Sequence, residues 1–180
     1  RSWLYNTLCV SNALANSLSI KDRIALEYVP SSQDYLQSII EAMKENRVLN
    51  MTYHSYWKDE EHNFDVHPYC VKLFRQRWYM VARSTYSSYY EKGPRVYALD
   101  RITYLHKTEH SFRMPDDWDA AEYFEGCFGV IADHNTDIQP VTLKVSPWQA
   151  NYLRSLPLHE SQQETERTPE YSIFTCLLRP

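Results

Sequence analysis

The sequence predicts an α+β protein: a small antiparallel β-barrel preceded by one helix and followed by part of an α/β unit. Two observations predict this fold class. Between residues 48 and 106, short segments with strand-like alternation follow one another closely, each joined to the next by turn residues, which is typical of small barrels. Over residues 141–178 the periodicity changes in the order β-α-β-β. A chain of 180 residues is long enough for one or two small domains.

The helix before the barrel is predicted from residue 35 to about residue 46. Apolar residues recur there with 3.6-residue spacing and form one face of an amphipathic helix: Tyr35, Leu36, Ile39, Ile40 and Met43. The stretch Pro30-Ser31-Ser32 is a break that suits a helix start. We expect residues 1–30 to be a helical linker.

Five barrel strands are predicted after this helix, at residues 48–57, 64–74, 77–83, 95–99 and 103–106. Pro68 lies within the second strand and indicates an edge or a bend, because proline has no backbone N–H to donate. Arg75-Gln76 predicts a tight hairpin. Residues 84–93 are polar and rich in tyrosine, which indicates a loop.

The third strand has two distinct faces. Trp78, Met80 and Ala82 share one face, which we expect to be core. The other face carries Tyr79 and Arg83 and lies in the most basic part of the chain, so we interpret it as a ligand-binding face.

After the barrel, a helix is predicted over residues 115–128, with two acidic residues in its first turn and glycines at its end. A second unit follows, with strands at 141–145, 158–163 and 171–178 and a helix that starts at Pro147. We therefore expect four segments: a helical linker (1–30), a barrel with its leading helix (31–112), a helix and linker (113–140), and a truncated extension domain (141–180).

The charge is unevenly distributed. The chain has a formal net charge of −4, but the window from residue 67 to residue 107 contains eight Lys or Arg residues and only two acidic ones. A basic island in an acidic chain favours an anionic partner for that island. Strands that simply expose basic polar faces are the alternative.

Other compositional features exclude several classes of protein. Only 3 glycines are present, which argues against Gly-rich phosphate-binding loops. The 4 cysteines form no CxxC pair, so we expect reduced thiols in a cytoplasmic protein without a metal or another cofactor. No signal peptide, transmembrane run or lipidation motif is visible in the sequence.

Several motifs carry a resemblance to a known family. Trp78-Tyr79-Met80 is preceded by Val66-His67-Pro68-Tyr69 and followed by Arg95-Val96-Tyr97 and Asp100-Arg101-Ile102. In this order, and after Met51-Thr52-Tyr53, they resemble the WYL domain of bacterial transcription regulators over roughly residues 31–107. Met80 stands at the family's leucine position, a nearly isosteric exchange.

The resemblance implies an Sm-like, SH3-like barrel that senses an effector, reported for some members to be nucleic acid or a nucleotide. It also implies homodimers that bind operator DNA through an N-terminal winged helix-turn-helix. We find no such domain here and, because the chain begins at Arg1, we expect a fragment. Residues 141–180 resemble the first half of the family's C-terminal extension domain.

A phosphate-bearing ligand needs arginines for the anion and aromatic rings for a base. We expect Tyr79 and Arg83 to meet Arg95 and Tyr97 across neighbouring strands. Arg101 either completes this site or pairs with Asp100. The predicted ligand-binding residues are His67, Tyr79, Arg83, Arg95 and Arg101, with Tyr53 and Tyr56 as outer candidates.

Two other classes of function remain open. The barrel could be a protein-interaction or dimerisation module without a small ligand. A zinc or thiol hydrolase is a weaker alternative, because metal-ligand spacings are absent. His67 and Cys70, three residues apart on a strand, should point to opposite faces. We therefore do not expect an enzyme.

Overall fold

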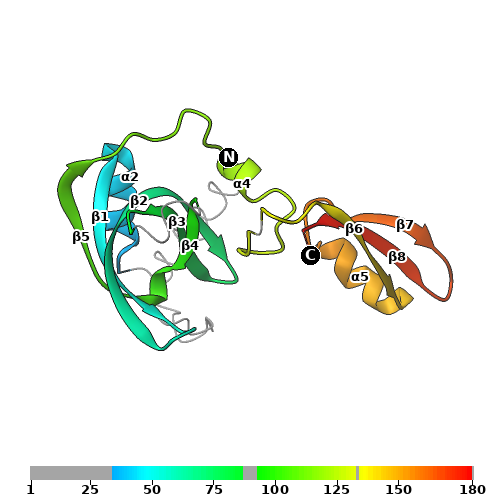
Figure 1. Cartoon of the computed structure of the whole chain (residues 1–180). Coiled ribbons are helices and arrows are strands. Elements are labelled where there is room, and N and C mark those ends of the chain that lie inside the picture. Colours follow the sequence, from blue (N-terminus) through cyan, green and yellow to red (C-terminus); the bar gives the residue numbers. More distant parts are fainter. Residues whose placement is uncertain (1–33, 87–92, 133, 180) are drawn as a thin grey trace, which may run out of the picture. The chain divides into compact units, whose positions relative to one another are not determined.

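The structure is a computed structural model that describes residues 34–86, 93–132 and 134–179 (Figure 1). The predicted linker at residues 1–30 and the middle of the tyrosine-rich loop lie outside the described residues. The described residues form a mixed α+β structure with one five-stranded and one three-stranded antiparallel sheet. None of the helices in the described ranges is both long and apolar enough to cross a membrane.

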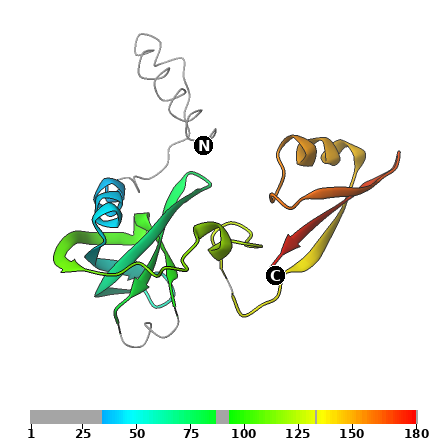
Figure 2. The same ribbon diagram turned by 90° about the horizontal axis from the view of Figure 1, so that it is seen from above.

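The predicted leading helix is present as α2 (Leu36–Glu45). It ends at Asn46, which adopts a left-handed conformation with φ 51°, a conformation that asparagine tolerates better than most residues. Ile39 and Ala42 are fully buried and pack with Leu49 and Met51 of the sheet. The amphipathic pattern therefore places α2 against the sheet, as Figures 1 and 2 show.

The five-stranded sheet consists of β1 (Arg47–Ser55), β2 (Glu60–Phe74), β3 (Arg77–Ser84), β4 (Arg95–Ala98) and β5 (Ile102–Ser111) in the order β4-β3-β2-β1-β5. The long strand β2 pairs with β1 through its first half and with β3 through its second. The edge strands β4 and β5 are joined by a single turn of 3₁₀ helix at Leu99–Arg101 but do not pair with each other. The predicted antiparallel, barrel-like fold is confirmed, but the barrel is not closed.

The predicted core face of β3 is confirmed. Met80 and Ala82 are fully buried in a cluster that also contains Leu49, Met51 and Val66, and Trp78 packs against it. In the register, Met80 lies opposite Val71 on β2 and Tyr97 on β4. We call this the inner face of the sheet.

Pro68 marks an irregularity in β2. The register between β2 and β3 shifts between Pro68 and Cys70, so Tyr69 is an extra residue on β2. A β-bulge is one of the few places where a sheet accommodates proline. The bend predicted from Pro68 is thus a bulge inside the sheet.

The three-stranded sheet is formed by β6 (Gln139–Val145), β7 (Gln163–Arg167) and β8 (Ser172–Leu178), in the order β6-β8-β7. The helix α5 (Pro147–Ser155) begins after Ser146, whose side chain accepts a hydrogen bond from the backbone N–H of Gln149. Ala150 and Leu153 of this helix pack on Phe174 of β8. The predicted β-α-β-β order is therefore confirmed.

The strand predicted at residues 158–163 is wrong. Residues 157–162 are largely turn, and β7 begins at Gln163. The Gln162 side chain accepts from the backbone N–H of Leu158 and donates to the carbonyl of Leu153. A side chain thus satisfies backbone groups that a strand would otherwise pair.

The helix predicted at residues 115–128 is also mostly wrong. Only α4 (Ala120–Tyr123) is helical, with Asp119 accepting a hydrogen bond from the Glu122 N–H at its start. Gly126, with φ +70°, follows. The surrounding residues contact β2 and the residue before β4 and do not complete a helix. We call residues 112–129 the covering segment.

The hairpin predicted at Arg75-Gln76 is present, but with an unusual backbone. Both residues have positive φ, 46° and 64°, as the two central residues of a type I′ turn require. Such conformations cost a side-chain-bearing residue about 1–2 kcal/mol each relative to glycine. Asn-Gly is the pair that this turn favours.

Replacing Arg75 by Asn and Gln76 by Gly together should therefore stabilise the protein by about 1 kcal/mol. The measurement is the urea midpoint of unfolding of the double variant against the unaltered chain. A reversed pair, Arg75→Gly with Gln76→Asn, is the matched control and should gain less. A lower midpoint for the Asn-Gly variant would contradict the type I′ geometry.

Candidate functional site

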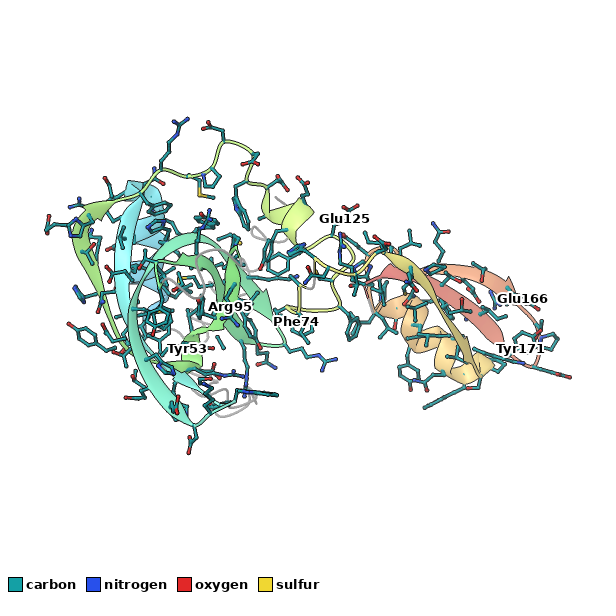
Figure 3. All side chains as sticks on the ribbon, viewed as in Figure 1. Tyr53, Phe74, Arg95, Glu125, Glu166 and Tyr171 are labelled. Carbon is teal, nitrogen blue, oxygen red and sulfur yellow. The ribbon has the colours of Figure 1, made fainter. Side chains whose placement is uncertain are left out.

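The predicted site residues fall into three groups, and Figure 3 labels one residue of the first group, Tyr53, and one of the third, Arg95. Tyr53 and Arg101 lie at the inner face, with Tyr56 just beyond the end of β1. His67, Tyr79 and Arg83 lie on the opposite, outer face of β2 and β3. Arg95 is also on the side of the inner face but lies at the exposed start of the edge strand β4.

Tyr53 lies at the boundary of the core. Its ring packs edge-on against Tyr97 with centroids 5.2 Å apart. Its hydroxyl oxygen accepts a hydrogen bond of 3.3 Å from the backbone N–H of Ala98. Burial raises the pKa of Tyr53, and the nearby charge of Arg101 acts in the opposite direction. The hydroxyl is therefore neutral near pH 7 and lies close to the Arg101 guanidinium.

Arg101 is held by the 3₁₀ turn that joins β4 to β5. The central carbon of its guanidinium lies 4.1 Å from the centre of the Tyr56 ring, a cation–π contact. Its Nε atom is buried and has no hydrogen-bond partner in the part of the chain that the structure describes. Tyr56 is 64% exposed. A cationic side chain thus lies between the core and an exposed ring.

Asp100 does not pair with Arg101. One of its carboxylate oxygens lies 3.4 Å from a guanidinium nitrogen of Arg77, and the other is buried without a hydrogen-bond partner among the described residues. Buried polar atoms without a partner are costly, by about 1–3 kcal/mol, and are rare in folded proteins. Arg101 and Asp100 therefore offer a donor and an acceptor that water or a ligand would satisfy. We call Tyr53, Tyr56, Asp100 and Arg101 the Arg101 site.

The outer-face residues are in a different environment. His67 lies directly opposite Arg83 in the sheet register. The His67 ring stacks on Phe112 of the covering segment, with centroids 4.8 Å apart and planes 8° from parallel. Burial lowers the pKa of His67, and the charge of Arg83 lowers it further. His67 is therefore uncharged at neutral pH.

The covering segment makes further contacts with the same face. Trp118 packs on Tyr69 with centroids 4.9 Å apart. The Lys72 ammonium lies 3.7 Å from the centre of the Phe124 ring and donates to the carbonyl of Gly129. Much of the face predicted to bind a ligand is thus occupied by the protein's own residues.

The predicted convergence of Tyr79 and Arg83 with Arg95 and Tyr97 is wrong. Ala82 lies opposite Arg95, and Met80 lies opposite Tyr97. Cross-strand partners share a face of a sheet, so Arg95 and Tyr97 are on the inner face, whereas Tyr79 and Arg83 are on the outer one. The sequence shows which residues alternate within a strand but not the register between strands, and this one-residue difference separates the two pairs.

The expectation that His67 and Cys70 point to opposite faces is also wrong, because of the bulge in β2. His67 lies opposite Arg83, and Cys70 lies opposite Val81. Arg83 and Val81 share the outer face, so His67 and Cys70 share it too, because Tyr69 adds one residue between them. Burial, however, raises the pKa of the Cys70 thiol to about 11. A protonated thiol is a weak nucleophile.

Cys70 should accordingly resist alkylation. At pH 8.5 its thiolate fraction is roughly a hundredfold below that of a thiol with a pKa near 9, and Cys70 is only partly exposed. Peptide mapping by mass spectrometry after iodoacetamide treatment of the native protein measures this. Glutathione in the same tube is the control, and modification of Cys70 at the glutathione rate would contradict the assigned environment.

Metal-ligating side chains do not gather in the parts of the chain that are described: no three His, Cys, Asp or Glu residues lie close enough to hold an ion there. His54 and His62 instead lie 3.0 and 3.3 Å from Asp59 and Glu60. That the protein is not an enzyme stays a prediction.

Asp100 and Arg77 are not among the site residues predicted from the sequence, where Asp100 enters only as an alternative partner of Arg101. One feature of the sequence does indicate Asp100 as a site residue. The pair Asp100-Arg101 directly follows a short strand, and functional residues are common in the connections that follow strands. Nothing in the sequence indicated that Arg77, at the start of β3, would reach Asp100.

These features define a class of protein domain: a helix and a curved five-stranded antiparallel sheet whose inner face ends in an arginine and aromatic rings. Comparison with protein-family models finds a match to the WYL domain at residues 34–106. This stretch of the chain is therefore a WYL domain. The resemblance noted from the motifs is confirmed.

Two further comparisons complete this result. No curated protein matches the chain. Among solved structures, proteasome accessory factor B/C (PafBC) of Arthrobacter aurescens is similar with a TM-score of 0.44 and 18% sequence identity. The match covers 86% of this chain and 22% of PafBC, so this chain spans about a fifth of the length of that protein.

Proposed function

We propose that this WYL domain is the effector-sensing part of a transcription regulator, and that its effector is a nucleotide or a short single-stranded nucleic acid bound at the Arg101 site. The ligand's phosphate contacts Arg101, and a base stacks on Tyr56. The observation that carries the proposal is the Arg101 guanidinium, which has a buried and unpartnered Nε and lies against an exposed ring.

The chemistry of the site matches this ligand class. Arginine is suited to phosphate because its planar guanidinium donates several hydrogen bonds at fixed angles. An exposed tyrosine ring can stack on any nucleobase, which contributes about 1–3 kcal/mol per base. Trp57, the neighbour of Tyr56, is 92% exposed and offers a second ring at the tip of the β1–β2 hairpin. The proposal involves no catalytic step.

Binding of a short, fluorescein-labelled single-stranded oligonucleotide, followed by polarisation, tests the proposal. We expect saturable binding whose affinity falls roughly threefold per phosphate contact between 50 and 200 mM salt. Dextran sulfate, a polyanion without bases, should compete weakly at equal charge concentration. Competition by dextran sulfate as strong as that by unlabelled oligonucleotide would reduce the site to a non-specific anion surface.

A protein-interaction or dimerisation module is the second candidate. The observation that favours it is the exposure of Tyr56 and Trp57 at one hairpin tip, because exposed aromatic residues are common at the centres of protein interfaces. Mass measurement in solution with and without oligonucleotide separates the two candidates. A homodimer that ignores oligonucleotide favours the second.

Operator DNA is a further proposed partner of the whole regulator. In this proposal the contact with the operator is made by a winged helix-turn-helix domain outside residues 34–106, and effector binding at the Arg101 site changes the affinity of a homodimer for that operator. This chain alone should then bind single strands without recognising an operator duplex. Equal affinity for a duplex of the same sequence would contradict this division of roles.

A further inference from the structure

A pocket of about 270 Å³ lies beside α4, away from the Arg101 site. Its lining combines aromatic rings, carboxylates and one arginine: Asp117, Trp118, Asp119, Glu122, Tyr123, Glu125, His134 and Arg179. We call it the α4 pocket. Its volume lies just below the range of small-molecule sites in proteins, so a compact ligand would fit.

Three rings form one wall of the α4 pocket. Tyr123 is 8% exposed, and its ring centroid lies 5.0 Å from that of Trp118 and 4.8 Å from that of His134. Tyr123 is tilted by 44° to Trp118 and by 54° to His134, so the three rings do not form a flat stack. The faces of such rings carry negative partial charge and attract cations.

The position of this wall is fixed by the sheet. The Tyr123 hydroxyl donates to the carbonyl of Pro94 next to β4, and Trp118 packs on Tyr69 of β2. The rings therefore do not need to be ordered when a ligand enters, which lowers the entropic cost of binding.

The charge of the lining is strongly negative. Four carboxylates line the pocket against a single guanidinium, that of Arg179. Arg179 is engaged elsewhere, because it donates to the backbone carbonyls of Glu125 and Thr136. Asp119 accepts a hydrogen bond from the Glu122 N–H, whereas the structure gives the side chains of Asp117, Glu122 and Glu125 no partner among the described residues. Three carboxylates are thus available to a ligand.

We propose that the α4 pocket binds a small organic cation, an ammonium group carried on a compact aliphatic body. The ammonium contacts the faces of Trp118 and Tyr123, and the carboxylates of Asp117 and Glu122 supply the opposite charge. An anionic or neutral ligand of the same size would lack the attraction to these carboxylates. This ligand is opposite in charge to the one proposed for the Arg101 site, and the α4 pocket shares no lining residue with that site, so we expect the two sites to bind independently.

A charged probe and its neutral isostere test the proposal. Choline and 3,3-dimethyl-1-butanol have nearly the same shape and differ in the charge of the quaternary centre. Isothermal titration calorimetry of the unaltered chain should detect choline binding in the millimolar range or tighter and at least tenfold weaker binding of the alcohol, since only the cation is attracted to the faces of desolvated rings. Equal affinities would overturn the proposal.

Substitutions in the lining of the α4 pocket test whether choline binds there. The double variant Asp117→Asn and Glu122→Gln removes two exposed charges whose carboxylates have no hydrogen-bond partner among the described residues, and should lower choline affinity at least tenfold. The charge-matched control is Glu61→Gln with Glu170→Gln, two exposed residues outside the pocket, which should leave choline affinity within twofold. Equal losses in both double variants would show general attraction to an acidic protein and overturn the site.

A substitution of Trp118 tests how much the aromatic rings contribute to choline affinity. Trp118→Phe keeps a ring against Tyr69 and should weaken choline binding several-fold, with oligonucleotide binding unchanged. Thermal unfolding of each variant reports whether the covering segment is intact. Loss of oligonucleotide binding together with choline binding in this variant would contradict the independence of the two sites.

Discussion

Replacing Arg101 by Ala is expected to lower the affinity for a single-stranded oligonucleotide roughly 10- to 100-fold. A hydrogen bond to a charged group contributes about 1.5–3 kcal/mol, and here the donor Nε is already buried and desolvated before the ligand arrives. The loss should appear in polarisation titrations at low salt. The stability of the fold should change little, because the variant also removes a buried polar atom that lacks a partner.

Two further changes at the site refine this result. Arg101→Lys keeps the charge but loses the planar contact with Tyr56, so its affinity should be intermediate. Tyr56→Ala should lose about 1–3 kcal/mol of stacking, and it should do so for a nucleotide but not for inorganic phosphate. These differences distinguish a nucleotide site from an anion site.

The site predicted from the sequence needs Arg83 and Arg95, whereas the Arg101 site does not include them. Substitutions of arginines other than Arg101 therefore distinguish the two. Arg75→Ala, at the exposed hairpin, is the charge-matched control and should change the affinity less than threefold. The double variant Arg83→Ala and Arg95→Ala removes two residues that lie on different faces of the sheet. If this double variant abolishes binding while Arg101→Ala does not, the ligand binds elsewhere and the Arg101 site is wrong.

Replacing Phe174 by Ala should destabilise the three-stranded unit by about 3–5 kcal/mol, the usual cost of emptying a buried phenylalanine site. Phe174 is 2% exposed, and among the described residues its cluster contains two other buried ones, Ala150 and Leu153. Few other apolar side chains of the described residues hold α5 on the sheet, and the main polar contact is Arg154, which donates hydrogen bonds to Glu164 and Ser172. The unit should therefore lose its protection from hydrogen exchange over residues 139–178.

The matched control is Phe128→Ala. Phe128 is 45% exposed, and truncating a surface residue usually changes stability by no more than about 0.5 kcal/mol. In the Phe174 variant the protection of β1 to β3 should persist, since their core is a separate cluster. Equal effects of the two variants on residues 139–178 would refute the assigned core.

Elements in which apolar side chains repeat with a regular helical or strand spacing were predicted well. The helix at residues 36–45, the third strand and the core face of Trp78, Met80 and Ala82 follow from side-chain periodicity alone. The failures at residues 115–128 and 158–163 share a cause. In both segments side chains or glycines make local contacts that compete with regular structure, and such contacts leave no period in the sequence.

By itself the sequence determined the α+β class, the order of the elements, the WYL motifs and the basic island. Only the tertiary structure decided which of the basic and aromatic residues meet. The register between β3 and β4 and the bulge after Pro68 set the face of each side chain, and both are properties of paired strands. The covering segment then occupies the outer face, whereas the turn between β4 and β5 brings Arg101 to Tyr56. Contacts between residues far apart in the chain depend on packing, which a single strand's pattern does not encode.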